Sequence, residues 1–113
     1  MQFTQKGECL SVTRITGPSH NVLGIEFGAG IANSEIVVDE LDKQGGPVRS
    51  LAREDVKRNV LLGISEANDQ FGTAYVVKRI EFVPHDSPPV EIYRLLAKSI
   101  IERIVRGEPF MYS

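Results

Sequence analysis

The sequence predicts an α+β domain, a two-layer sandwich with a four-stranded sheet and two helices on one face, in the order βββαβα. Its first half shows the period-2 alternation of strands, and its second half shows two stretches of helical spacing around one strand. A length of 113 residues with 42% hydrophobic side chains suits one domain with one core. We expect a single domain over residues 1–113, with a frayed tail at about 108–113.

Three short strands are expected in the first half. Residues 10–14 alternate apolar and polar side chains, and residues 20–27 place every second apolar side chain on one face. Residues 35–39 are rich in β-branched side chains, which favour strands. Gly17-Pro18-Ser19 predicts a turn, and the composition of residues 42–47 predicts a loop.

From Ser50 onward the spacing of apolar residues becomes helical. The expected buried stripe consists of Val56, Val60, Ile64 and Ala67. Ser50 is a candidate N-cap, and Glu54 and Asp55 lie in the first turns, where the helix dipole favours anions. Gly72 predicts the end of this helix.

A fourth strand is expected over residues 73–83, followed by the last helix. Lys78 falls on the otherwise apolar face of this strand, which predicts a bulge or an exposed strand end there. Ser87-Pro88-Pro89 combines a capping hydroxyl with a proline suited to the first helical position. Helical spacing then continues to Gly107, a typical C-terminal stop. The expected stripe of this helix consists of Tyr93, Leu96, Ala97, Ile100, Ile104 and Val105.

Alternation assigns the strand residues to two faces of the sheet. The core face is expected to contain Leu10, Val12, Leu23, Ile25, Phe27, Ile36, Val38, Val76, Ile80 and Phe82. The opposite, open face is mainly polar, with a small apolar patch of Val22, Val37, Tyr75 and Val77. Such a patch is typical of a partner surface or a homodimer interface, although single exposed valines are also ordinary on protein surfaces.

Three short motifs in the second half form a recognisable series. Gly63-Ile64-Ser65-Glu66-Ala67 is similar to a G-I-x-E-A pattern, and Gly72 followed by Val76-Val77 resembles a G-x-P-V-V strand entry. His85-Asp86, with Glu91 six positions after the histidine, resembles an H-D-x4-E pattern that leads into a helix.

In these motifs the segment 52–105 resembles the fourth domain of elongation factor G, of the ribosomal-protein-type βββαβα superfamily. The resemblance covers about half of the chain. It implies a strand–helix–strand crossover of left hand, against the usual right-handed rule. It also implies a role at the ribosome. The stretch from Gly63 to His85 is several residues shorter than in that family, Pro88-Pro89 replaces its acidic and serine residues, and its phosphate-binding loop is absent.

Few residues suggest catalysis. Cys9 is the one candidate nucleophile, with His20 or His85 as base and Asp86 or Asp42 as the orienting acid. No nucleophile elbow or oxyanion loop accompanies Cys9, and a lone cysteine beside a strand is usually a small buried hydrophobe. An enzyme is therefore the minority interpretation, and we assign no catalytic residue.

Metal and cofactor sites are not expected. The histidines and neighbouring aspartates show no metal-ligand spacing, and Asp86 before a helix is explained by hydrogen bonds to helix N–H groups. Gly28-Ala29-Gly30 superficially resembles a dinucleotide fingerprint. Asn33 stands at the position of the fingerprint's third glycine, however, and a strand rather than a helix is expected to follow. We expect no cofactor.

The basic residues offer a second function. Ten of the 13 Lys and Arg lie from Arg49 to Arg106. Two helical stripes consist of Arg49, Arg53 and Lys57, and of Arg94 and Lys98. Both stripes are suited to phosphates, but nearby acids and a pI near 5.7 favour solvated helix faces over a nucleic-acid surface.

The leading expectation is a small, non-catalytic interaction domain that binds a protein partner or a second copy through the open sheet face. A ribosome- or RNA-associated role is the alternative. The longest apolar run, at residues 60–64, is too short to span a membrane, and the first residues contain no signal peptide. We therefore expect a cytoplasmic protein.

Overall fold

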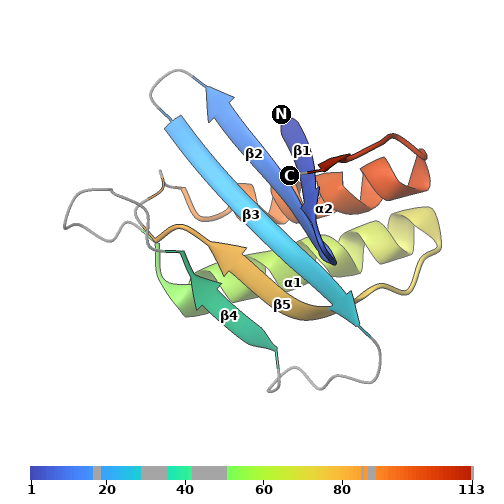
Figure 1. Ribbon diagram of the computed structural model, residues 1–113. Coiled ribbons are helices and arrows are strands. Elements are labelled where there is room, and N and C mark those ends of the chain that lie inside the picture. The colour runs from blue at the N-terminus through green and yellow to red at the C-terminus, as the bar shows by residue number, and fades with distance from the viewer. Residues whose placement is uncertain (17–18, 29–35, 42–50, 85, 87–88, 113) are drawn as a thin grey trace.

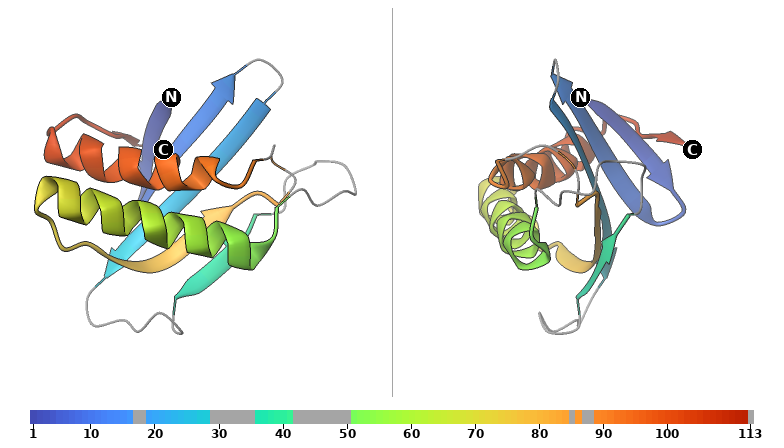
Figure 2. Two further views of the ribbon diagram at one scale, coloured as in Figure 1. Left: turned by 180° about the vertical axis from the view of Figure 1, so that it is seen from behind. Right: turned by 90° about the vertical axis from the view of Figure 1, so that its left-hand side faces the viewer.

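The computed structural model describes residues 1–16, 19–28, 36–41, 51–84, 86 and 89–112. These residues form an α+β fold with two helices and one sheet, and the helices cover one face of the sheet (Figures 1 and 2). The expected fold class and the helical layer are thus confirmed. The expected four strands and the expected order βββαβα are wrong, because within the described residues the sheet has six strands and a further strand stands at each end of the expected series.

The elements follow the order β1–β2–β3–β4–α1–β5–α2–β6. The strands are β1 (Gln2–Lys6), β2 (Cys9–Thr16), β3 (Ser19–Gly28), β4 (Val37–Glu40), β5 (Val76–Phe82) and β6 (Met111–Tyr112). The helices are α1 (Arg53–Phe71) and α2 (Ile92–Val105). Across the sheet the strand order is β4-β5-β3-β2-β1-β6, with parallel pairing at both edges and antiparallel pairing between them.

The two unexpected strands lie together at one edge of the sheet. β1 has the mostly polar sequence QFTQK, in which Phe3 is the one large apolar side chain. β6 has two residues and pairs in parallel with Thr4 and Gln5 of β1. The tail expected to fray therefore pairs with the sheet. An edge strand buries few side chains, so neither segment has the alternation that predicts a strand.

The connection from β4 through α1 to β5 joins two adjacent parallel strands. In Figure 1 both strands point to the upper left, β5 lies on the β3 side of β4, and α1 lies behind the sheet. Seen from behind in Figure 2, α1 lies in front of these strands. This arrangement makes the crossover left-handed, the opposite of the usual hand.

A bulge at Lys78 changes the alternation of β5. Glu26 pairs with Arg79 and the next residue, Phe27, pairs with Val77, so Lys78 is the extra residue. The predicted bulge is confirmed, and it reverses which residues face inward before it. Val77 is buried in the core, whereas Val76 is 37% exposed, so the expected core position of Val76 is wrong.

The helix α1 ends as expected but begins differently. Gly72 adopts φ 67°, the left-handed conformation that favours glycine, and its N–H donates to the carbonyl oxygen of Asn68. The N-cap position is Ala52, which makes no side-chain capping hydrogen bond. Ser50, the expected N-cap, lies outside the described residues.

The helices pack closely at Gly63. A Cβ atom at this position would overlap the carbonyl oxygen of Arg94 in α2, and it would also lie 3.1 Å from the Cβ of Ala97. Only a hydrogen atom fits between the two helices here. The first residue of the G-I-x-E-A-like motif thus sets the helix–helix distance.

The last helix begins at Ile92, later than the expected Pro88, and its N-cap position is Glu91. It is followed by Gly107 at φ 70°, as expected. Val105, an expected stripe residue, is 46% exposed. The helix buries Tyr93, Leu96, Ala97, Ile100 and Ile101.

The core lies between the helices and the sheet. The sheet contributes fully buried Val12, Leu23, Ile25, Ile80 and Phe82, all of them expected there. Leu10, Phe27 and Val38 are partly buried against this cluster. Correct alternation in β2 and β3 thus identifies the opposite, open face.

Candidate functional site

The open face of the sheet is the surface that the two helices leave uncovered, as the right-hand view of Figure 2 shows. Leu10, Val12, Leu23 and Ile25 contribute to the core, so the alternate residues of β2 and β3 point to the open face. Around the centre of this face lie Cys9, Ser11, Gly24, Glu26, Asp39, Arg79 and Glu81.

Arg79 lies among three carboxylates on this face. It forms an ion pair with Asp39 of the parallel neighbour β4. Asp39 raises the pKa of Arg79 most, and Glu81 and Glu26 raise it further through their negative charges. Three carboxylates and one guanidinium leave this group, which we call the acidic cluster, with a formal charge of −2.

Gly24 lets the Cys9 thiol reach across the central strand. Cys9 lies in β2 and Glu81 in β5, on either side of β3, yet the Cys9 Sγ donates to Glu81 Oε1 at 3.0 Å. A Cβ at position 24 would lie 3.0 Å from this Sγ and 3.1 Å from Ser11 Oγ. The missing side chain therefore makes room for the thiol–carboxylate hydrogen bond.

The environment of Cys9 favours the protonated thiol. Burial, and then the hydrogen bond and negative charge of Glu81, raise its pKa from 9.0 to about 12. A thiolate is the nucleophilic form of cysteine, and nucleophilic cysteines have lowered pKa values. The geometry thus gives Cys9 the role of a hydrogen-bond donor.

The raised pKa of Cys9 makes stability depend on pH. Because the folded chain holds this proton more tightly than the unfolded chain, the contribution is complete below pH 9 and is lost as pH rises toward 12. Urea unfolding at pH 8, 10 and 11 is expected to show a falling free energy of unfolding. The decline should be shallower in Cys9→Ala, and an equal decline in both proteins would contradict the assignment.

The expected apolar patch is not assembled on the open face. Val77 is in the core because of the bulge, and Tyr75 is on the helix side, where its ring lies 4.9 Å from that of Phe27. Val22 is half-buried, and Val37 is 51% exposed on β4. Placing all four residues on one surface was wrong.

Most arginines are paired with acids. In the described part of the chain the paired arginines are Arg53, Arg58, Arg79, Arg94, Arg103 and Arg106. Of the predicted phosphate-binding stripes, Arg53 lies 3.7 Å from Glu40 and Arg94 pairs with Glu66. Lys98 is half-buried, and Arg49 lies outside the described residues.

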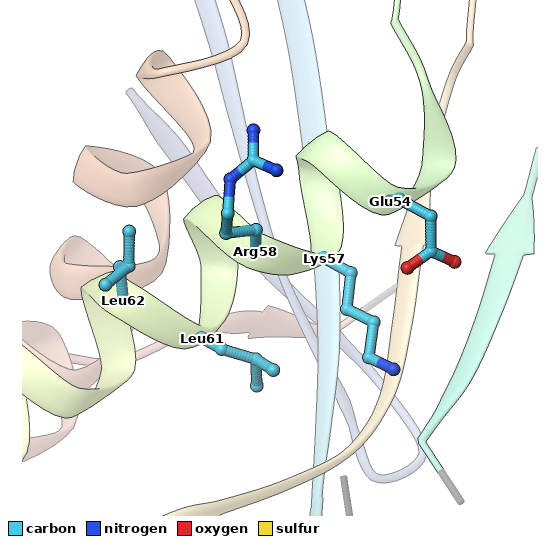
Figure 3. A pocket seen from close by; sticks show the side chains of 5 residues that line it. All are labelled: Glu54, Lys57, Arg58, Leu61 and Leu62. Atoms are coloured by element: carbon cyan, nitrogen blue, oxygen red, sulfur yellow. The ribbon is translucent and has the colours of Figure 1, made fainter. Parts of the chain in front are cut away.

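Lys57 lines an open hollow of about 500 Å³ on the outer surface of α1 (Figure 3). Glu54, Arg58, Leu61 and Leu62 complete its lining. In Figure 3 the side chains of Arg58 and Leu62 point away from those of Lys57, Leu61 and Glu54. Because these groups diverge, they do not form a site around one ligand.

Asp86 is buried and connects the segment that precedes α2 to the sheet. Its Oδ2 accepts a hydrogen bond of 2.8 Å from the backbone N–H of Val22 in β3. The fully buried Tyr93 lies nearby, and burial raises the pKa of its hydroxyl, which the charge of Asp86 raises further. This contact with β3 gives Asp86 a structural role. Glu91 of the same motif is exposed, and His85 lies outside the described residues.

The structure does not assemble a triad of Cys9 with His20. In the β2–β3 ladder His20 pairs with Ile15, whereas Cys9 lies next to Leu10, which pairs with Ile25. The two side chains therefore lie at opposite ends of β2. Asp42 and His85, the other candidates, are outside the described residues, and among those described no group of three His, Cys, Asp or Glu could hold a metal ion.

Sequence reasoning missed Asn68, which fixes the turn from α1 to β5. Its Nδ2 donates to the carbonyl oxygen of Tyr75, and its Oδ1 accepts from the N–H of Tyr75 and the hydroxyl of Thr73. Asparagine before a glycine stop is a weak signal that could have indicated this role.

Comparison of the chain with family models, curated proteins and solved structures found no match. Among the described residues, no helix is long and apolar enough to cross a membrane.

Proposed function

We propose that this chain is a non-catalytic protein-binding domain whose contact surface is the open face of the sheet. The observation that carries this proposal is the acidic cluster, in which Arg79 lies among Asp39, Glu81 and Glu26 on the uncovered face. Charge complementarity then favours a partner that presents a basic surface.

The charge of this face also favours a different protein as the partner over a second copy of this chain. Two open faces brought together would each carry the −2 charge of the acidic cluster, and like charges oppose association. The expected apolar contribution of Tyr75 and Val77 is missing there. Binding of a different protein through this face is thus favoured over a homodimer.

The test is capture of partners at low and moderate salt with wild-type chain and two variants. Glu26→Lys reverses one charge of the acidic cluster, and Lys57→Glu is the matched control on the opposite, helical surface. We expect a salt-sensitive partner, identified by mass spectrometry, that Glu26→Lys loses and Lys57→Glu retains. A partner lost only in Lys57→Glu would overturn the proposal.

Light scattering of the free chain tests self-association directly. We expect the mass of a monomer. A dimer that Val22→Glu dissociates and Lys57→Glu leaves intact would establish the open face as a homodimer interface instead.

A ribosome- or RNA-associated role is the second candidate. The left-handed crossover is the observation that favours it, because the resemblance to the fourth domain of elongation factor G implies this hand. Salt-sensitive co-sedimentation with ribosomes that is lost in Arg53→Glu with Arg94→Glu would support this role. Unchanged co-sedimentation of the double variant would show that the predicted basic stripes do not bind the ribosome.

A further inference from the structure

The edge of β1 already binds an extended segment, namely residues 108–112 of the same chain. Met111 and Tyr112 pair in parallel with Thr4 and Gln5, and Figure 1 shows β6 beside β1 at the end of the sheet. β6 covers two of the five residues of β1. The surface that receives this segment, which we call the receptor, lies on the helix side of β1 and includes Phe3 and Arg103.

Three side chains form the contact. The rings of Phe3 and Phe110 meet edge to face, with centroids 5.8 Å apart. The Arg103 guanidinium lies 4.4 Å from the centroid of Phe3 and 6.0 Å from that of Phe110. Aromatic pairs and cations over rings are both favourable contacts, so Phe110 is the anchor of the segment.

Arg103 also recognises the backbone and charge of the segment. Its Nε donates to the carbonyl oxygen of Pro109 at 2.8 Å, and its Nη1 lies 3.5 Å from Glu108 Oε2. The receptor thus contacts an acidic side chain, then a backbone carbonyl, then an aromatic side chain at three successive positions of the segment. These features describe a peptide ligand.

The segment is weakly held beyond its anchor. Met111 is 64% exposed and Tyr112 is 84% exposed, so the paired residues bury little apolar surface. Gly107 precedes the segment at φ 70°, and a two-residue ladder contributes few hydrogen bonds. Segments with few buried contacts open at low free-energy cost.

We propose that the edge of β1, with Phe3 and Arg103, is a binding site for an extended segment of a partner protein, and that residues 108–112 occupy it as a displaceable internal ligand. The partner segment carries an aromatic residue in the place of Phe110 and an acidic residue two positions before it. It adds a strand to β1, the mode of recognition in which main-chain pairing supplies affinity and a side-chain pocket supplies specificity. This inference rests on the proposed protein-binding function but uses a different surface.

Fluorescence anisotropy with a labelled, end-capped peptide of residues 107–112 tests the site on the full chain. In wild-type chain the internal segment competes, so the apparent affinity is reduced by the fraction of open molecules. Phe110→Ala in the chain weakens the competitor and leaves the receptor intact. We expect the peptide to bind this variant about tenfold more tightly than wild type.

Three controls identify the cause. Adding Phe3→Ala to the Phe110→Ala chain removes the aromatic receptor and should abolish the gain. A peptide with alanine in place of Phe110 should bind at least tenfold more weakly than the original, because it loses the contacts of this ring with Phe3 and Arg103. Leu95→Ala, an exposed change on α2, should leave the affinity at the wild-type value.

Equal affinity of the peptide for wild-type and Phe110→Ala chains would overturn the proposal. If Phe110→Ala does not fold, Met111→Pro is the second variant, because it removes a backbone N–H from β6 and keeps the anchor. A wild-type dimer that Phe110→Ala dissociates would identify the occupant as a second copy and overturn the partner assignment. Glu26→Lys should leave peptide binding unchanged, so failure of the open-face proposal is distinguishable from failure here.

Discussion

Gly63→Ala is expected to lower the free energy of unfolding by about 3 kcal/mol, since overpacking against backbone is at the costly end of such substitutions. The new Cβ would overlap the Arg94 carbonyl oxygen, which cannot rotate away as a side chain can. The two helices would have to separate along their closest contact. Urea unfolding, followed by circular dichroism, measures the loss.

The opposite sign is what helix propensity alone predicts, because alanine in a helix is favoured over glycine by about 1 kcal/mol. Ser65→Ala is the matched control on the exposed side of α1 and should be neutral or slightly stabilising. An increase in stability for Gly63→Ala would show that the helices do not approach as closely as described.

Asp86→Ala is expected to lower the free energy of unfolding by about 2 kcal/mol, the range for hydrogen bonds to charged groups. The change removes the acceptor for the Val22 N–H and leaves that group, in a partly buried position, without its side-chain partner. The start of β3 would then lose its connection to the segment that precedes α2.

Asp86→Asn separates the hydrogen bond from the charge, because the amide oxygen can still accept from Val22. We expect it to recover part of the stability lost in Asp86→Ala. Hydrogen exchange at the Val22 amide gives a local readout, and faster exchange should accompany Asp86→Ala. Unchanged exchange in both variants would contradict the assigned contact.

Much of the fold could be predicted from local patterns. The apolar stripe of α1, the glycine stops at Gly72 and Gly107, and the bulge at Lys78 each have a signal within a few residues. The edge strands β1 and β6 could not be predicted in this way. β6 pairs with β1 from the far end of the sequence, and the mostly polar β1 is held by pairing with the adjacent β2, so neither strand has an alternating pattern of its own.

The candidate surfaces were less predictable because they depend on register. Asp39, Arg79 and Glu26 meet only when three strands pair in a particular alignment, which no single segment encodes. The contact of Phe3 with Phe110 joins positions near opposite ends of the chain. The wrong assignment of Val77 has a different cause, since one extra residue reversed the alternation from which its face was predicted.

The bulge divides β5 into two parts in which the inward-facing residues alternate out of step with each other. After Lys78 the even-numbered residues Ile80 and Phe82 face inward, whereas before it the odd-numbered Val77 does. Deleting Lys78 would thus leave a regular ladder in which Val77 directly precedes Arg79 and still faces inward, whereas counting Lys78 as an ordinary strand position turns Val77 outward and Val76 toward the helices. A search pattern for distant chains of this architecture should accordingly allow one skipped position in this strand.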